Sequence, residues 1–210
     1  MRQVAAGESP SPKRRGRPPS GGREAILRAT LQVLREHGVA RMTTREVARR
    51  AGVSEGSVFY HYGDRAGLLM AVFVRGLEPL QAFNAGGLEG ESPLEVLTEV
   101  GEAIARFLDE GLPVMVAAQS DRQLPEALAA YMSANDLGPQ RGVENLAAYL
   151  LREQRAARLR SDVPPRAVAT MLVASTFLRV FQQQLTGSDL LPGVPEIAEA
   201  LMTLLSPNSS

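Results

Sequence analysis

The 210-residue sequence predicts an all-α protein on three observations. Residues 23–78 contain no proline, and their apolar side chains recur at the three- and four-residue spacing of one helix face. Beyond them, prolines return at intervals that are typical of helix starts and kinks. No stretch of useful length alternates apolar with polar residues, and neither Asn-Gly nor Asp-Gly marks a hairpin.

The elements follow in order. Residues 1–22 are rich in Pro, Gly and Ser without apolar periodicity, which predicts an unfolded basic arm. Gly38 is placed to end the first helix, Asp64 to cap the fourth, and a Gly-rich loop is expected over residues 85–91. Helices are predicted over residues 23–37, 44–51, 55–62, 65–83, 94–110, 113–121, 125–135, 139–158, 165–186 and 195–205.

Composition excludes several classes of site. The chain has no Cys, which removes disulfides, thiolate zinc ligands and thiol nucleophiles. It has only two His, so a His-rich metal site is not expected, and we predict neither a metal nor a cofactor. No apolar run approaches the ~20 residues of a membrane span, and no secretory signal is visible. The expectation is a soluble, cytoplasmic protein without a membrane partner.

The net charge of zero conceals an asymmetry between the two parts of the chain. Residues 1–66 carry 13 Lys and Arg against 6 Asp and Glu, whereas residues 67–210 carry 10 against 17. A basic first third on an acidic body indicates that one end of the protein meets a polyanion.

Residues 42–63 contain the strongest local signals. Thr43 is placed to cap the second helix, and Glu46 three residues later is expected to complete a capping box. Gly52 lies where the chain must turn sharply through a left-handed conformation. Ser54 then caps the third helix. Two short helices joined by a tight turn are therefore expected here.

The spacing in this stretch is typical of a helix-turn-helix: a small residue, a glycine four positions later and an apolar residue six beyond that, here Ala48, Gly52 and Val58. Val47, Ala51 and Val58 supply its small core. An ordinary helical hairpin would use the same Ala and Gly only for close packing. A one-signed charge around the turn favours DNA binding instead. It comes from Arg41, Arg45, Arg49 and Arg50.

Residues 23–72 resemble the DNA-binding domain of TetR-type (tetracycline-repressor) bacterial regulators. The resemblance rests on His37-Gly38, the runs 43–48, 51–54 and 57–62, Asp64-Arg65 and Leu68-Leu69. It covers about a quarter of the chain, and the rest matches the family only in length and helical character. It implies an N-terminal three-helix helix-turn-helix DNA-binding domain over residues 23–66. A larger helical ligand-binding and dimerisation domain would follow over residues 67–210.

The resemblance also implies a set of DNA-binding residues. These are Thr44, Arg45, Ser54, Glu55, Ser57, Phe59, Tyr60, His61 and Arg65. Thr44 would donate to a phosphate at a helix N-terminus, and Arg65 would bind a further phosphate. Phe59 departs from the family because it lacks the hydroxyl that often contacts DNA there. Glu55 departs too: its carboxylate repels phosphate unless it accepts from a cytosine amino group, or it only favours the helix dipole.

The basic arm contains a motif of its own. Arg15 and Arg17 flank a glycine in Arg-Gly-Arg-Pro, which looks like the core of an AT-hook. Such an extended segment can lie in the narrow minor groove of A·T-rich DNA. The alternative is a generic basic tail that only adds phosphate affinity.

The C-terminal two thirds would sense a ligand and join two subunits. The family pairs its last two long helices, so we expect dimer contacts from Leu178, Phe181, Leu185, Ile197, Leu201 and Leu204. Met and aromatic residues are adaptable pocket linings, although each could equally be plain core. The pocket candidates are Phe83, Phe107, Met115, Gln119, Tyr131, Tyr149, Met171 and Phe177. We expect Pro113 to begin a short mobile helix that a ligand could shift.

The leading interpretation is a DNA-binding regulator, a homodimeric repressor that a small apolar or amphipathic effector releases from its double-stranded operator. The alternative is an architectural or partner-recruiting DNA-binding protein without a ligand, which the arm would suit. An enzyme is disfavoured because the sequence shows no nucleophile elbow, phosphate loop, paired-His motif or dinucleotide signature.

Overall fold

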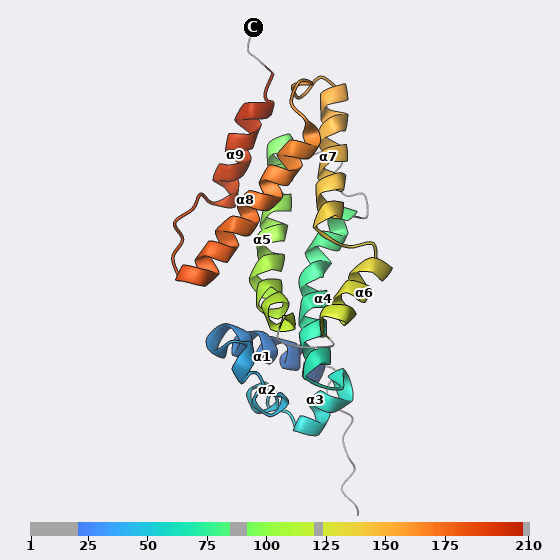
Figure 1. The fold of residues 1–210 in the computed structure, drawn as a ribbon, viewed down its shortest axis with the longest axis vertical. Coiled ribbons are helices and arrows are strands. Elements are labelled where there is room, and N and C mark those ends of the chain that lie inside the picture. The colour runs from blue at the N-terminus through green and yellow to red at the C-terminus, as the bar shows by residue number, and fades with distance from the viewer. Residues whose placement is uncertain (1–20, 85–91, 120–123, 208–210) are drawn as a thin grey trace, which may run out of the picture.

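The structure, a computed structural model, describes residues 21–84, 92–119 and 124–207. Within these ranges the regular elements are helices and no strand occurs, which confirms the all-α prediction (Figure 1). The α-helices are α1 (Gly21–His37), α2 (Thr44–Ala51), α3 (Glu55–Tyr62), α4 (Arg65–Asn84), α5 (Pro93–Ala118), α6 (Leu124–Ala134), α7 (Pro139–Arg155), α8 (Pro165–Thr186) and α9 (Val194–Leu205). A 3-10 turn, η1 (Val39–Arg41), joins α1 to α2.

Helices α1–α3 lie together at one end of the molecule, and α5, α7, α8 and α9 form the larger part (Figure 1). Helix α4 runs from the small unit into the large one, so the expected domain division at residues 66 and 67 falls inside a continuous helix. Two clusters of buried apolar residues make the core, one around α1–α4 and one around α5, α7, α8 and α9. Leu80, Phe107 and Met115 pack against both clusters.

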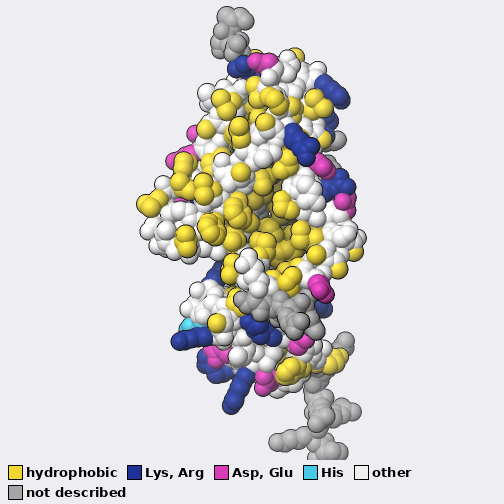
Figure 2. Space-filling model, viewed as in Figure 1, with side chains coloured by type: hydrophobic (Ala, Val, Ile, Leu, Met, Phe, Trp, Pro, Cys, Tyr) yellow, Lys and Arg dark blue, Asp and Glu magenta, His cyan; other side chains and the backbone are white. Residues whose placement is uncertain are grey.

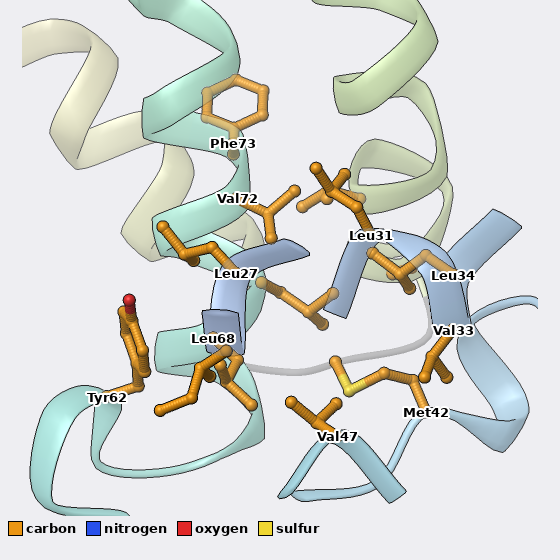
Figure 3. Packing of buried hydrophobic residues seen from close by; sticks show 14 of the residues in the cluster. Leu27, Leu31, Val33, Leu34, Met42, Val47, Tyr62, Leu68, Val72 and Phe73 are labelled. Carbon is orange, nitrogen blue, oxygen red and sulfur yellow. The ribbon is translucent and has the colours of Figure 1, made fainter. Parts of the chain in front are cut away.

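The core of the small unit forms where α1 and the two short helices α2 and α3 meet α4. Met42, Val47 and Val58 are almost completely buried, and Leu68 of α4 closes the cluster from the other side. Figure 3 shows Met42 and Val47 directed toward the leucines of α1. Each fully buried side chain of this size contributes roughly 1.5–3 kcal/mol. Burial of their apolar faces therefore stabilises helices that are too short to persist alone.

The local signals of the helix-turn-helix are confirmed. Thr43 Oγ1 accepts from the Glu46 amide at 3.2 Å, and Ser54 Oγ accepts from the Ser57 amide at 3.1 Å. Gly52 adopts φ 66° and ψ 30°, the left-handed conformation that ends α2. One detail is wrong: the Glu46 carboxylate does not complete a capping box. It binds Arg49 and Arg50 on its own helix instead, because two guanidinium groups outcompete one amide for a carboxylate.

The predicted separate helices over 94–110 and 113–121 are wrong, because α5 runs unbroken through Pro113. A proline inside a helix leaves the carbonyl four residues earlier without its amide donor. That carbonyl belongs to Asp109, and Gln184 of α8 donates to it from Nε2 at 3.4 Å. A side chain distant in sequence thus supplies a donor in place of the missing amide.

Other helix ends differ from the prediction by one to three residues. Helix α1 begins at Gly21, inside the segment expected to be the arm. Helix α7 ends at Arg155 rather than at residue 158, since Ala157 adopts a positive φ of 57°. Asp64 does cap α4, with Oδ1 accepting from the Gly67 amide at 2.8 Å. The predicted loop over residues 85–91 lies outside the described residues.

Candidate functional site

Helix α3 presents an aromatic outer surface. Tyr60 is 81% exposed and Phe59 is 49% exposed, while Val58 and Tyr62 on the opposite face are buried. The rings of Tyr60 and His61 meet edge to face with centroids 5.1 Å apart. The predicted residues Ser54, Glu55, Ser57, Phe59, Tyr60 and His61 are therefore brought together on or beside one short helix. A helix of this size fits the major groove of DNA.

The inner face of α3 is anchored to the start of α1. The Tyr62 hydroxyl donates to the Arg23 carbonyl at 2.9 Å, and the Arg23 guanidinium lies 5.6 Å from the centre of the Tyr62 ring. The phenol is protonated and donates at neutral pH, since burial raises the pKa of Tyr62 still further above an ordinary value that is already well above neutral. This contact spans 39 residues and fixes the orientation of the outer surface.

Arg65 makes contacts inside the small unit, in addition to any DNA contact that the resemblance implies. Its Nε donates to the Met42 carbonyl at 3.1 Å and its Nη2 donates to the Val39 carbonyl at 2.9 Å. The guanidinium thus holds the segment between α1 and α2 against the first turn of α4. Sequence reasoning did not find this role, since 23 and 26 residues separate the partners.

The arginines around the turn divide into two pairs. Arg49 and Arg50 are bound to Glu46, and their hydrogen bonds lower the pKa of Glu46 to about 2. Arg50 also reaches Glu36 of α1. These two arginines were expected to add to a one-signed field, but their charges are locally balanced. Arg41 and Arg45 are exposed, and no ion pair to either occurs in the described part of the chain.

Thr44 and Glu55 are joined across the turn. Thr44 Oγ1 donates to Glu55 Oε1 at 2.7 Å, linking the first residue of α2 to the first residue of α3. Both residues are half-buried. A hydroxyl has one proton, so Thr44 cannot donate to a phosphate while this bond exists. The remaining predicted DNA contacts, Arg15 and Arg17, lie outside the described residues.

A cavity of about 500 Å³ lies between α4, α5, α7 and α8. Four of the predicted pocket residues line it: Phe83, Phe107, Met115 and Phe177. No Asp, Glu, Lys, Arg or His is among its lining residues. Its polar side chains are Gln140, Asn145 and Thr170. Figure 2 shows apolar side chains gathered around a hollow in the middle of this face.

A neighbouring groove of about 660 Å³ between α4–α7 shares Phe73, Met115, Met132, Leu137 and Gln140 with the cavity. Gln119, predicted as a pocket residue, lines this groove rather than the cavity. The shared residues place the two hollows side by side.

Three of the pocket predictions are corrected. Tyr149 is 1% exposed and belongs to the core, with the Arg152 guanidinium over its ring. Met171 is 50% exposed on the outside of α8. Tyr131 packs against the core and lines neither hollow. Sequence reasoning also missed aliphatic lining residues such as Leu77 and Ile104, although Phe73, Leu77 and Leu80 share one face of a helix.

The outer face of α8 and the end of α9 carry exposed apolar side chains. Leu178, Phe181, Leu185 and Leu204, all predicted dimer contacts, are between 41% and 72% exposed. Phe177 and Phe181 stack with ring centroids 5.9 Å apart. Ile197 is half-buried in the subunit core.

Leu201 is the correction in this set, because only 6% of it is exposed and it packs inside the subunit. The helical period of α9 turns it toward α5 and α8. Its neighbours on the outer side, such as Leu204, remain accessible.

The described residues contain neither a membrane-spanning helix nor a candidate metal site. None of the helices there is long and apolar enough to cross a membrane. No group of three or more His, Cys, Asp or Glu residues in those ranges could hold a metal ion.

Comparisons with known proteins agree with the site. Residues 26–72 match the model for bacterial regulatory proteins of the tetR family. The chain is 33% identical over 85 residues to the HTH-type transcriptional regulator BetI of Stenotrophomonas maltophilia. The match covers 40% of this chain and 33% of BetI, so the chain spans about a third of that relative's length. It is 31% identical over 139 residues to the HTH-type transcriptional regulator Mb3439c of Mycobacterium bovis, over 62% of this chain and 72% of that protein.

Among solved structures, the complex of SmeT with triclosan superposes with a TM-score of 0.66 at 20% identity. The match covers 90% of this chain and 93% of SmeT, a multidrug efflux pump repressor of Stenotrophomonas maltophilia. At that identity the likeness concerns the fold, and it extends over both units of the molecule. Together with the match over residues 26–72 and the relative covered over 72% of its length, these findings show that the chain belongs to the TetR family of bacterial regulatory proteins.

Proposed function

We propose that this protein is a homodimeric repressor that binds its operator through α3 and is released by a small apolar or amphipathic ligand. The observation that carries the proposal is the position of α4. Its residues Phe73 and Leu77 line the uncharged cavity, and Leu68, at the other end of the same helix, is buried in the core of the helix-turn-helix. One continuous helix thus connects a ligand-sized hollow to the core beneath the candidate DNA-binding surface.

The surface of α3 supports the DNA-binding part. Tyr60 is exposed and His61 is half-buried, and Arg45 of α2 is exposed with no ion partner in the described ranges. In helix-turn-helix proteins the second helix enters the major groove while neighbouring cations contact phosphates. Figure 2 shows arginine side chains, with acidic side chains among them, at the end of the molecule that carries α1–α3.

The apolar face of α8 supports the homodimer. Leu178, Phe181 and Leu185 are exposed along one helix, with Leu204 of α9. Single exposed leucines are ordinary, but a run of this kind marks an interaction surface. A two-fold pair would place two copies of α3 about one or more helical turns apart on the operator.

The cavity supports an uncharged ligand. Burying a charge without a partner is costly, and the lining residues include no ionisable side chain. Gln140, Asn145 and Thr170 give polar contacts for a hydroxyl, ether or carbonyl group. The volume of about 500 Å³ lies within the range of small-molecule sites. SmeT, which shares the fold, is described in complex with triclosan.

Release then follows from linkage. A ligand that binds the cavity more tightly in one arrangement of α4 shifts the dimer toward that arrangement. If the two α3 helices no longer match successive major grooves, operator affinity falls. Operator DNA must weaken ligand binding by the same factor.

Fluorescence anisotropy with the DNA that flanks the protein's own gene tests the proposal, with scrambled DNA as reference at ~0.15 M salt. The variants are Arg45→Ala and, as a matched control, Arg155→Ala, which removes an exposed arginine from α7. We expect the wild type and the control to prefer the native DNA, and Arg45→Ala to lose that binding. Equal binding to both DNAs, weakened only by deletion of residues 1–20, would support an architectural DNA-binding protein instead.

A further inference from the structure

The carboxylate of Glu55 lies at the turn between the two helices of the helix-turn-helix. It is the first residue of α3, the helix proposed to enter the major groove, and it is half-buried. No Lys, Arg or His forms an ion pair with it in the described part of the chain. Arg49 and Arg50 bind Glu46 and Arg65 binds two carbonyl groups, whereas Arg45, the residue after Thr44, is exposed and forms no ion pair in the described ranges.

Thr44 holds this carboxylate in one orientation. Its hydroxyl donates to Oε1 at 2.7 Å from the first residue of the preceding helix. An ionised carboxylate only accepts hydrogen bonds and has about four acceptor positions. One is used by Thr44, and the positions on Oε2 remain for a donor that comes from outside the protein.

The chemistry of the major groove restricts that donor. Phosphate groups repel a carboxylate, so favourable contact must come from a base edge. Cytosine presents an amino donor at N4, and adenine presents an amino donor at N6 directly beside the acceptor N7. A carboxylate that faces adenine therefore meets a repelling lone pair as well as a donor, whereas cytosine offers the donor alone.

We propose that Glu55 is a specificity-determining residue that reads a cytosine in each operator half-site, and that Thr44 is its positioning residue. The inference rests on the proposed function, since it specifies how α3 recognises the operator. A carboxylate that only favoured the dipole of α3 would stabilise the helix and leave base preference unchanged.

The test is selection from a randomised double-stranded DNA library, followed by anisotropy titration of the selected site and its single-base variants. We expect the wild type to prefer cytosine at one position of each half-site by about tenfold. Glu55→Gln keeps the shape of the side chain and adds an amide donor that suits adenine N7, so its preference shifts to adenine at that position. Glu55→Ala binds all four bases there within about twofold.

Two further variants separate positioning from structure. Thr44→Val removes the hydroxyl and is expected to reduce the discrimination for cytosine, while Thr44→Ser retains the donor and the discrimination. Glu36→Gln, which removes one negative charge at the end of α1, is the charge control and keeps the wild-type base preferences.

The outcomes are distinct. If Glu55→Gln and Glu55→Ala select the wild-type motif at every position, the assignment of Glu55 is wrong while operator binding stands. A uniform gain in affinity across all sequences would also overturn it, because Glu55 would then only repel phosphate. A wild-type protein that enriches no motif would contradict the proposed function itself.

Discussion

Arg75 of α4 donates a hydrogen bond of 3.0 Å from Nη1 to Oε1 of Glu24 in α1. Its Nη2 lies 3.6 Å from a carboxylate oxygen of Glu110 in α5. One guanidinium, only 20% exposed, therefore joins α1 of the small unit to α4 and α5, two of the helices that line the cavity. A second ion pair, Arg35 with Asp109, connects α1 to α5 directly.

We predict that Arg75→Gln reduces the coupling between ligand and operator. The ratio of operator affinities without and with a releasing ligand is expected to fall roughly threefold, because α4 can then move without moving α1. The ratio is measured by anisotropy titration. The control is Arg106→Gln, whose ion pair with Glu102 lies within α5. An unchanged ratio in Arg75→Gln would show that coupling runs through other contacts.

Cavity filling tests the ligand site. We expect Val173→Trp, on the wall formed by α8, to weaken binding of the neutral fluorescent probe N-phenyl-1-naphthylamine by about tenfold, because one large side chain occupies the space. Val116→Trp, at an exposed position of α5 outside both hollows, is the matched control. Equal probe binding by both variants would place the probe elsewhere.

Gly101 of α5 faces α8 and α9 without room for a larger side chain. A β-carbon there would lie 2.6 Å from Val194 Cγ1 and 3.3 Å from Leu172 Cδ1. Gly101→Ala is expected to destabilise the protein by about 1–3 kcal/mol through overpacking. Gly142→Ala in α7 has no heavy atom within 4 Å of the added carbon and should stabilise by roughly 0.4–1 kcal/mol. Urea midpoints measure both, and a stable Gly101→Ala would mean that α9 shifts at little cost.

Replacing Arg65 should lower the stability of the protein, whereas replacing Arg45 should weaken DNA binding. Arg65→Ala leaves the Met42 carbonyl without its side-chain donor and the Val39 carbonyl with the Met42 amide alone, and we expect a loss of about 1–3 kcal/mol in the free energy of unfolding. Arg45→Ala should leave stability unchanged and reduce the slope of log affinity against log salt by about one unit. Thermal melts and salt titrations measure the two effects. A full-unit slope change in Arg65→Ala would assign it to a phosphate as well.

The contacts of Glu46 with Arg49 and Arg50 should make the stability of the folded protein depend on pH. Hydrogen bonds from Arg49 and Arg50 lower the pKa of Glu46 from 4.5 to about 2. A lowered pKa means that the carboxylate stabilises the folded state fully above pH 4.5 and loses this contribution as the pH falls toward 2. The melting temperature of the wild type should be higher than that of Glu46→Gln above pH 4.5, and the two temperatures should converge near pH 2. Glu99→Gln, which changes an exposed glutamate, is the control and should have the same melting temperatures as the wild type at every pH. If the melting temperatures of Glu46→Gln differed from those of the wild type by a constant amount at every pH, the role of Glu46 and its two arginines would be refuted.

The sequence by itself determined the features whose partners lie within a few residues. The bounds of α2 and α3, the caps at Thr43 and Ser54 and the left-handed turn at Gly52 were all predictable. Each depends on a hydrogen bond or a backbone preference that spans three to five positions. The all-α fold was predictable for the same reason, since helical periodicity is local.

Only the tertiary structure decided the features whose partners are far apart. Thr44 was expected to donate to a phosphate, but in the structure its hydroxyl donates to Glu55, 11 residues away. Gln184, from a helix 75 residues further on, supplies the donor that Pro113 removes at Asp109, so that a local rule for a helix break fails. Tyr149 and Leu201 become core because their helix faces meet other helices. Residue type states what a side chain is able to bind, and packing decides which group it meets.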